Sequence, residues 1–405
     1  MRVVFMGTPD FSVGTLRELA KAGHEIAGVI SQPDKPKGRG KNLQPTPVKE
    51  AAMELGLPVY QPQKVRDPEF IQVMKELNPD VIVVVAFGQI IPKEILHMPK
   101  YGCINVHASL LPAYRGAAPI QWAVINGDKE SGVTIMRMDE GVDTGDMINK
   151  VIVPLNEKET GGSLFDRLSE SGAKLLVETL PMLEDGSAVF EKQPEESTTP
   201  YAAMISKKMG ELDWAKSATE LERLIRGLNP WPSAFSHLNG KTLKIWEASV
   251  EEENGEKKAP GTVLQADAKG FRIQTGEGIL KIDTLQLEGK KTNGCAGIFT
   301  WLYGGRRDDT SLLVYRFRNK CAIDLAADPI VQFSKIQRSH CCVCVFRTVY
   351  RYQCYTGESV KIDANRNNRR KKTWQMEQNF GESPWRYYWK LHRKKNTAIW
   401  QSEML

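Results

Sequence analysis

Apolar positions in the first ninety residues form short continuous runs with longer helical patterns between them. Residues 1–6 and 25–30 are short apolar runs, and 80–87 (DVIVVVAF) is the nearly unbroken β-branched run of a strand buried on both faces. A helical pattern between the first two runs ends at Gly23, with apolar positions Phe11, Val13, Leu16, Leu19 and Ala20. Strands that alternate with helices predict an α/β fold with a Rossmann-like, doubly wound parallel sheet.

The pattern changes after about residue 190. Residues 191–206 begin with the polar, Pro/Thr-rich stretch EKQPEESTTP and predict a linker. A short helical stretch at 218–227 follows, and then β-like segments at 242–246, 261–264, 271–275 and 279–287. Short strands separated by glycines and charged turns predict a small, OB-like β-barrel. We therefore expect a first domain over 1–190 and a second over 207–291.

Charge and cysteine are distributed unevenly along the 405 residues. Residues 1–291 carry 35 Lys+Arg against 40 Asp+Glu, whereas residues 292–405 carry 20 against 9, so the overall charge of +6 arises entirely in the tail. Six of the seven cysteines lie there too. The body has only Cys103, which fits a reducing compartment. No apolar run approaches the ~20 residues of a membrane span, and no secretory signal is evident, so we expect a cytoplasmic protein.

The chemically informative stretch is Gly102–Trp122, GCINVHASLLPAYRGAAPIQW. Asn105 and His107 are two residues apart, which places both on one face of a strand. Asp143 follows in the loop DEGVDTGD. The amide can donate to a developing oxyanion, the imidazole can stabilise that charge or shuttle a proton, and the carboxylate can fix the imidazole tautomer or accept a proton. The set suits acyl transfer to an external nucleophile, although a core histidine and a turn asparagine are alternatives for Asn105 and His107 alone.

The first strand ends in GTPDF and lacks the G-x-G-x-x-G pattern, which argues against a dinucleotide cofactor. The string from Asn105 resembles instead the signature of the folate-dependent formyltransferases, N-x-H-x-S-L-L-P-x-Y-R-G-x-x-P-I-Q-W followed by a loop Asp. Further segments up to about Lys291 are similar to the members that formylate initiator tRNA: VVFMGTPDFSV, PDKPKGRGK, AFGQIIP, GVTIMRMDEGVDTGDM and IRGLNPWPSAF.

The resemblance implies the formyltransferase fold and an activity. The formyl group of 10-formyltetrahydrofolate would pass directly to the α-amino group of methionyl-initiator tRNA, for translation initiation, without a metal and in a monomer. Asn105, His107 and Asp143 match the catalytic trio of the family. The positions that match its folate-binding segment are Ser109, Leu110, Leu111 and Pro112.

A basic loop, KPKGRGK at residues 35–41, carries four cations on a Gly/Pro-rich backbone: Lys35, Lys37, Arg39 and Lys41. A charge run of this kind is often only a solvated loop. In the family the matching loop approaches the acceptor stem, so the resemblance implies that these four residues bind tRNA phosphates, with Arg39 at the most important position.

The resemblance stops at Lys291, where family members continue with R-M-x-A-x-x-F-L-R-G-Y. One choice of codons for residues 292–304, read one nucleotide later, encodes R-M-D-A-Q-E-F-L-R-G-Y. We therefore interpret residues 292–405 as an out-of-frame tail without an expected fold, which leaves the second domain truncated. The alternatives are a genuine basic RNA-binding extension and a metal site at Cys341, Cys342 and Cys344.

Three other functions remain open on the sequence. A sugar-nucleotide formyltransferase shares the N-x-H and SLLP pattern. A hydrolase would release formate from the same folate. A non-catalytic protein would bind RNA through the basic tail and would not need His107.

Overall fold

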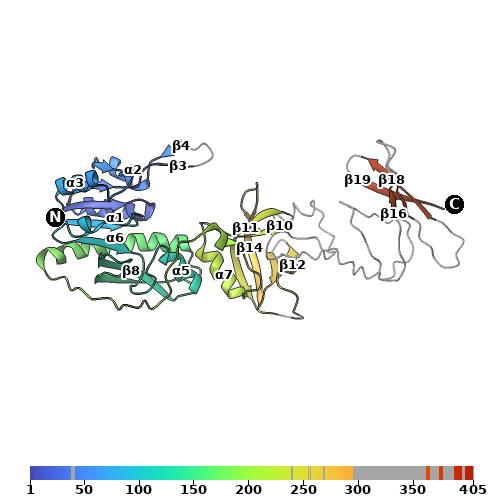
Figure 1. The fold of residues 1–405 in the computed structure, drawn as a ribbon. Helices are drawn as coiled ribbons and strands as arrows, with labels where there is room; N and C mark the ends of the chain where they lie inside the picture. Colours follow the sequence, from blue (N-terminus) through green and yellow to red (C-terminus); the bar gives the residue numbers. More distant parts are fainter. Residues whose placement is uncertain are drawn as a thin grey trace. The chain divides into compact units, whose positions relative to one another are not determined.

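The computed structural model describes most of the first 294 residues and four short strands beyond them (Figure 1). The described ranges are 1–37, 42–238, 240–253, 255, 257–267, 270–294, 362–364, 374–376, 387–394 and 397–404.

The first domain is built on a seven-stranded sheet in the order β5-β2-β1-β6-β7-β8-β9. Its strands are β1 (Arg2–Gly7), β2 (Glu25–Ile30), β5 (Val59–Tyr60), β6 (Val81–Val85), β7 (Cys103–His107), β8 (Glu130–Arg137) and β9 (Met147–Pro154). The first five in this order are parallel, which confirms the predicted doubly wound sheet. β8 and β9 run antiparallel and extend one edge, whereas the sequence pattern predicted a parallel sheet.

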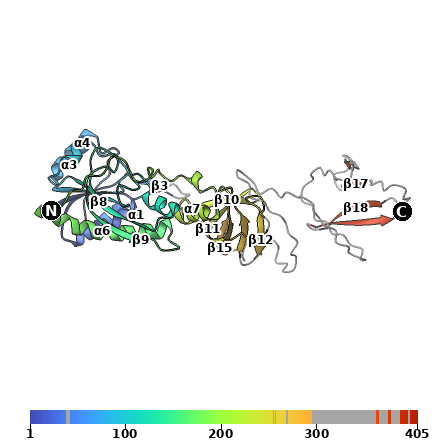
Figure 2. The same ribbon diagram turned by 90° about the horizontal axis from the view of Figure 1, so that it is seen from below.

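Helices cover both faces of this sheet (Figure 2). They are α1 (Asp10–Lys21), α2 (Pro47–Glu54), α3 (Pro68–Leu77), α4 (Lys93–Leu96), α5 (Pro119–Asn126) and α6 (Gly161–Asp185). Val3 and Phe5 of β1 pack with α1 and α6, whereas Val4 and Met6 pack with α3 and α4. Because successive strand residues point to opposite faces, a continuous apolar strand of this kind needs a helical layer on each side.

The second domain is an antiparallel sheet covered by α7 (Ala218–Gly227). Its strands are β10 (Ala234–Leu238), β11 (Lys241–Glu251), β12 (Val263–Asp267), β13 (Gly270–Gln274), β14 (Ile279–Leu287) and β15 (Asn293–Gly294), preceded by the 3-10 helix η1 (Lys207–Gly210). Leu221 and Ile225 of α7 contribute to the core over the sheet. The described strands follow the open order β10-β11-β14-β13-β12, with β15 on β14, so the predicted strands are present but closure into a barrel is not.

Two other predicted segments differ from expectation. The ends of the basic loop pair as two short strands, β3 (Lys35–Lys37) and β4 (Asn42–Gln44). In the tail, β16 (Ile362–Ala364) pairs with β17 (Trp374–Met376), and β18 (Tyr387–Lys394) pairs with β19 (Thr397–Met404), although we expected no fold there. The remainder of residues 295–405, including Cys341, Cys342 and Cys344, lies outside the described residues, and the out-of-frame origin of the tail stays a prediction.

The predicted linker is held against the first domain. We call residues 191–203 the strap. At its start, the backbones of Met147 and Glu191 exchange two hydrogen bonds of 2.8 Å. At its end, the Ala202 carbonyl accepts the N–H of Ala117 at 2.8 Å. Serine and threonine side chains supply contacts between these points. The Ser197 hydroxyl donates to the Pro112 carbonyl at 2.6 Å, and the Thr199 hydroxyl accepts the Tyr114 N–H at 2.6 Å. The polar composition that suggested a flexible linker thus provides hydrogen bonds to the domain surface.

Glu159, at the start of α6, has a buried carboxylate and a backbone carbonyl that contacts the second domain. Glu159 is 1% exposed, forms an ion pair with Arg167, and accepts the Asn156 N–H at 3.0 Å, while its carbonyl accepts Arg226 Nη1 of α7 at 2.7 Å. Burial, the largest influence, raises the pKa of the Glu159 carboxyl, but the hydrogen bonds from Ser163 and Asn156 and the charge of Arg167 together hold it below its usual value.

Glu159→Gln should therefore lower the free energy of unfolding at pH 7 by about 1–3 kcal/mol, because it weakens a buried, charge-assisted network. A carboxyl whose pKa is lower in the folded state stabilises the fold above its unfolded pKa, near 4.3, and loses that effect as the pH falls through the folded value. Urea unfolding of both proteins at several pH values should show the difference shrinking in acid. Glu170→Gln, which affects an exposed pair with Lys174 on the same helix, is the control and should have no measurable effect.

Candidate active site

The candidate catalytic residues lie at the carboxyl end of β7, where ligands of doubly wound sheets bind. Ile104 and Val106 of this strand point into the core beneath α1 and α6, whereas Cys103 belongs to the core on the opposite face. Asn105 and His107 alternate with the first pair and therefore share a face, as their spacing predicted. Both are buried, at 9% and 6% exposed.

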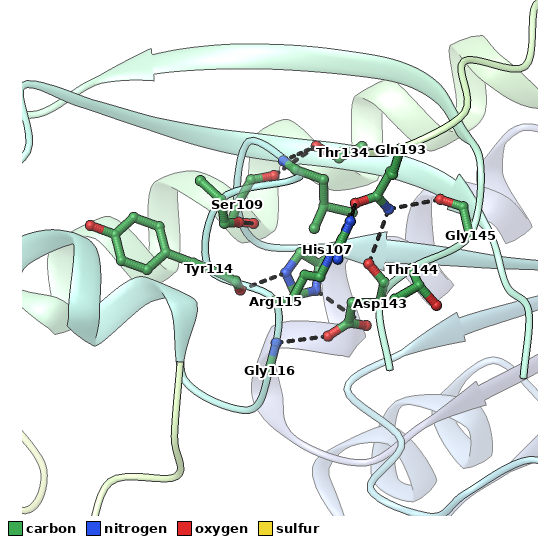
Figure 3. Close-up of polar contacts among 12 residues, drawn as sticks. His107, Ser109, Tyr114, Arg115, Gly116, Thr134, Asp143, Thr144, Gly145 and Gln193 are labelled. Carbon is green, nitrogen blue, oxygen red and sulfur yellow. Dashed lines mark hydrogen bonds and ion pairs between the residues drawn. The ribbon is translucent and has the colours of Figure 1, made fainter. Parts of the chain in front are cut away.

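His107 contacts the backbone on one side and a carboxylate on the other (Figure 3). Its Nε2 lies 3.1 Å from the Tyr114 carbonyl oxygen. Because a carbonyl oxygen can only accept, Nε2 carries the proton and donates it. Its Nδ1 lies 3.7 Å from Asp143 Oδ1, which is beyond hydrogen-bond length. The Nδ1 side of the ring is therefore the side available for proton transfer.

Asp143 is fixed through both its side chain and its backbone. Its φ of +54° lies in the left-handed region, which Asp tolerates better than most residues. Its Oδ2 accepts the N–H of Gly116 at 2.9 Å (Figure 3). Gly116 has a φ of +127°, and a Cβ there would come within 2.8 Å of the Ala202 carbonyl and the Tyr201 ring. Glycine is required because the strap passes directly over this backbone.

The Asn105 side chain is available to a substrate. Among the residues that the structure describes, its amide has no hydrogen-bond partner. An amide N–H donor with no competing acceptor can bind an oxygen that gains negative charge, which is the requirement for an oxyanion site.

Two residues beside this set have no role in the sequence analysis. Arg115 stands inside the quoted motif, and Gln193 lies in the predicted linker, yet Figure 3 shows Gln193 between Arg115 and the loop of Asp143. Both are buried, at 8% and 6% exposed. The place of Arg115 inside a specific motif is a signal that the sequence offers, whereas nothing local to Gln193 distinguishes it from its polar neighbours.

The four residues that match the folate-binding segment form a fixed turn after β7. The Ser109 hydroxyl donates to the Ala113 carbonyl at 2.6 Å. Leu110 packs against the backbone at Gly132, and Leu111 is buried with Met136 and Met147. Pro112 is half-buried at the end of the turn. Contact of this segment with a folate stays a prediction, and backbone groups and Pro112 are the parts best placed for it.

A cavity of about 810 Å³ adjoins the loop of Asp143. Gly141, Gly145 and Asp146 of this loop line it, together with Leu96 and Arg137. Most of its lining comes from residues 96–102, before β7, and from 137–146, and Asn105, His107 and Asp143 do not line it. Within the described part of the chain, no group of three His, Cys, Asp or Glu side chains could hold a metal ion.

The basic loop is only partly described. Lys35 is exposed on β3, and the β3–β4 hairpin extends from the side of the domain (Figure 1). The backbone of Lys37 belongs to the same strand. Arg39 and Lys41 lie outside the described residues, so tRNA binding by this loop stays a prediction. No helix among the described residues has the length and apolar character to cross a membrane.

Cys103, on the same strand, is not suited to be a nucleophile. It is fully buried, and burial raises the pKa of its thiol to about 12. Because the thiolate is the reactive species, iodoacetamide at pH 8 should leave Cys103 unmodified in the folded protein. Peptide mass spectrometry after timed alkylation checks this, and the same reaction in 8 M urea is the control. Complete labelling of Cys103 without denaturant would contradict the buried position.

Comparison with known proteins agrees with this architecture. The family model "Formyl transferase" matches residues 1–180, and "Formyl transferase, C-terminal domain" matches residues 204–300. A methionyl-tRNA formyltransferase of Agathobacter rectalis is 60% identical over 291 residues, which cover 72% of this chain and 93% of that protein. The methionyl-tRNA formyltransferase of Clostridioides difficile is 52% identical over 291 residues, 72% of this chain and 94% of that protein.

The chain belongs to the formyl transferase family. The predicted resemblance and fold class are thereby confirmed.

Solved structures show the same fold at lower identity. HypX of Aquifex aeolicus in complex with tetrahydrofolic acid has a TM-score of 0.51 and 21% identity, over 75% of this chain and 48% of that one. The sugar 3N-formyl transferase WlaRD has a TM-score of 0.52 and 20% identity, over 71% of this chain and 98% of that one. The roles of individual residues in this family member stay predictions.

Proposed function

We propose that this formyl transferase moves the formyl group of 10-formyltetrahydrofolate to the α-amino group of methionyl-initiator tRNA. The observation that carries the proposal is the convergence of Asn105, His107 and Asp143 at the carboxyl end of β7. The identity of 50–60% to methionyl-tRNA formyltransferases, over nearly their whole length, supports the choice of acceptor.

The side chains present suit the electronic demands of this reaction. When the amine attacks the formyl carbon, negative charge develops on the formyl oxygen. The Asn105 amide donates to this oxygen, and His107, when protonated on Nδ1, adds positive charge beside it. Such preorganised donors act strongly in a water-poor site, where their orientation is already fixed by the protein.

Asp143 is the proposed proton acceptor. The attacking amine must lose one proton as the new C–N bond forms, and the N10 atom of the folate must gain one as its bond to the formyl carbon breaks. The Asp143 carboxylate accepts the first proton, and the adjacent His107 ring provides a path for its return. Atoms and charge balance without a covalent enzyme intermediate, and Cys103 is too deeply buried to form one.

For the folate, the turn of residues 109–112, which comes just after His107, offers backbone groups next to the reacting groups. The exposed Lys35 and its neighbours on the β3–β4 hairpin supply cations for tRNA phosphates. The body up to Lys291 is acidic overall, so local cations, not net charge, must hold the acceptor stem.

The acceptor is tested by offering the purified full chain three reaction mixtures with radiolabelled 10-formyltetrahydrofolate. These contain methionyl-initiator tRNA, an amino-sugar nucleotide, or no acceptor. We expect label to appear as N-formylmethionine on the tRNA. Label on the sugar would support a sugar-nucleotide formyltransferase, and formate release without an acceptor would support a hydrolase. Either result without tRNA formylation would overturn the proposal.

A further inference from the structure

We propose that Gln193, held by Arg115, is a positioning residue that keeps the catalytic loop in its reactive conformation. This inference rests on the proposed function. It begins with the side-chain amide of Gln193, which donates to two carbonyls of the loop, that of Asp143 at 3.0 Å and that of Gly145 at 2.7 Å (Figure 3). The two bonds hold the backbone on either side of Thr144 to a single rigid group.

Arg115 orients this amide. Its Nε and Nη2 donate to Gln193 Oε1 at 3.1 and 2.9 Å. Its Nη1 also donates to the Glu195 carbonyl, at 2.9 Å, and its Nη2 to the Pro194 carbonyl, at 2.7 Å. Because the guanidinium can only donate, it fixes Oε1 toward itself and turns the NH₂ group of Gln193 toward the loop. Within the described part of the chain, no carboxylate pairs with Arg115.

The loop needs this support because its conformation is intrinsically unfavourable. Asp143 has a φ of +54°, and Tyr114, whose carbonyl accepts from His107, has a φ of +57°. Conformations of this kind persist only where surrounding contacts determine them, and they gather at functional sites. The Gly116 N–H fixes the Asp143 carboxylate, whereas Gln193 fixes its backbone. Together they set the 3.7 Å approach of Asp143 to His107.

One substitution separates positioning from simple anchoring of the strap. Gln193→Glu keeps the oxygen that accepts from Arg115 and gives that buried cation a carboxylate partner, so the strap stays attached. The same change replaces the NH₂ donor with an oxygen that faces the carbonyls of Asp143 and Gly145, which repels the loop. If Gln193 served only to anchor the strap, this variant would behave as the wild type.

Steady-state kinetics are measured for the full chain with each substrate varied in turn, and thermal unfolding is followed by circular dichroism. For Gln193→Glu we expect kcat to fall about 10- to 100-fold, the scale of a small misplacement at a reacting group. The KM for each substrate should change less than about threefold, and the unfolding midpoint should stay within 2 °C of the wild type. Glu195→Gln is the matched control, because Arg115 uses only the backbone carbonyl of that exposed residue.

Hydrogen exchange gives a readout that needs no substrate. Amides of residues 141–146 should exchange faster in Gln193→Glu than in Glu195→Gln, while those of β7 remain unchanged. Should the glutamate variant be less stable, Gln193→Met, which removes both ends of the hydrogen-bonding group at similar volume, is compared at a temperature where every variant is folded. Unchanged kcat and exchange in the folded variants would overturn the inference, as would losses that only follow stability. A wild type that transfers no formyl group, with the exchange difference intact, would refute the proposed function and leave the positioning role standing.

Discussion

His107→Ala should lower kcat for formyl transfer by about 10²- to 10⁴-fold, the usual contribution of a positioned acid–base group. The substitution removes the ring that lies between the Tyr114 carbonyl and the Asp143 carboxylate, so charge on the formyl oxygen loses its cationic partner and the proton loses its path. Single-turnover formylation with saturating folate and tRNA measures the chemical step directly. The KM values should change little, because the ring contributes mainly to the transition state.

His24→Ala is the matched control, since His24 lies just before β2, far along the chain from the site, and should leave the rate unchanged. A His107→Ala variant that is folded and retains more than about a tenth of the wild-type rate would show that the ring is a structural hydrogen-bonding group. That result would favour the alternative in which His107 is a structural core histidine without a catalytic role.

Restoring the reading frame after Lys291 should tighten tRNA binding about 10-fold, a difference of ~1.4 kcal/mol. In this variant R-M-D-A-Q-E-F-L-R-G-Y replaces residues 292–405. β15 pairs with β14 at Thr284 and Leu285, just after the point where the family resemblance stops. If the family ending supplies a further strand here, its absence would leave backbone groups unpaired and part of the second core uncovered. Folate affinity should not change, because the segment that matches the family's folate-binding positions, residues 109–112, lies in the first domain.

A third protein that stops at Lys291 distinguishes the effect of the present tail from the effect of the family ending. If the basic tail bound RNA, this protein would bind tRNA more weakly than the full chain, and the restored protein would gain nothing over the full chain. The alignment with the Agathobacter rectalis relative covers 72% of this chain and 93% of that protein, which is consistent with a different sequence at the C-terminal end of this chain. Independent sequencing of the codons around Lys291 tests the frame itself.

Local patterns were sufficient to predict the elements that carry the chemistry. The β-branched run at 81–85 can be satisfied only between two helical layers, so the sheet and its carboxyl edge followed from sequence. The two-residue spacing of Asn105 and His107 fixed their common face. Asp143 could be predicted only from its place in the family motif. Its 3.7 Å distance from His107 depends on chain segments that no local pattern relates.

Long-range contacts explain what the sequence could not predict. Gln193 is 50 residues from Asp143, and its importance depends on the strap crossing the first domain. A Pro/Thr-rich stretch has the composition of a flexible linker, and long-range hydrogen bonds, among them those to Pro112, Tyr114 and Arg115, hold it in place. The antiparallel direction of β8 and β9 could not be predicted either, because strand direction depends on pairing partners and not on side-chain alternation.

The most direct test of the account is the initial rate of N-formylmethionyl-tRNA formation by the full chain, compared with that of the Asn105→Ala His107→Ala double variant. We expect rapid, folate-dependent formylation of methionyl-initiator tRNA by the wild type and a loss of at least about 10³-fold in a folded double variant. Equal rates in the two proteins, or no formylation by a folded wild type at saturating tRNA, would contradict it.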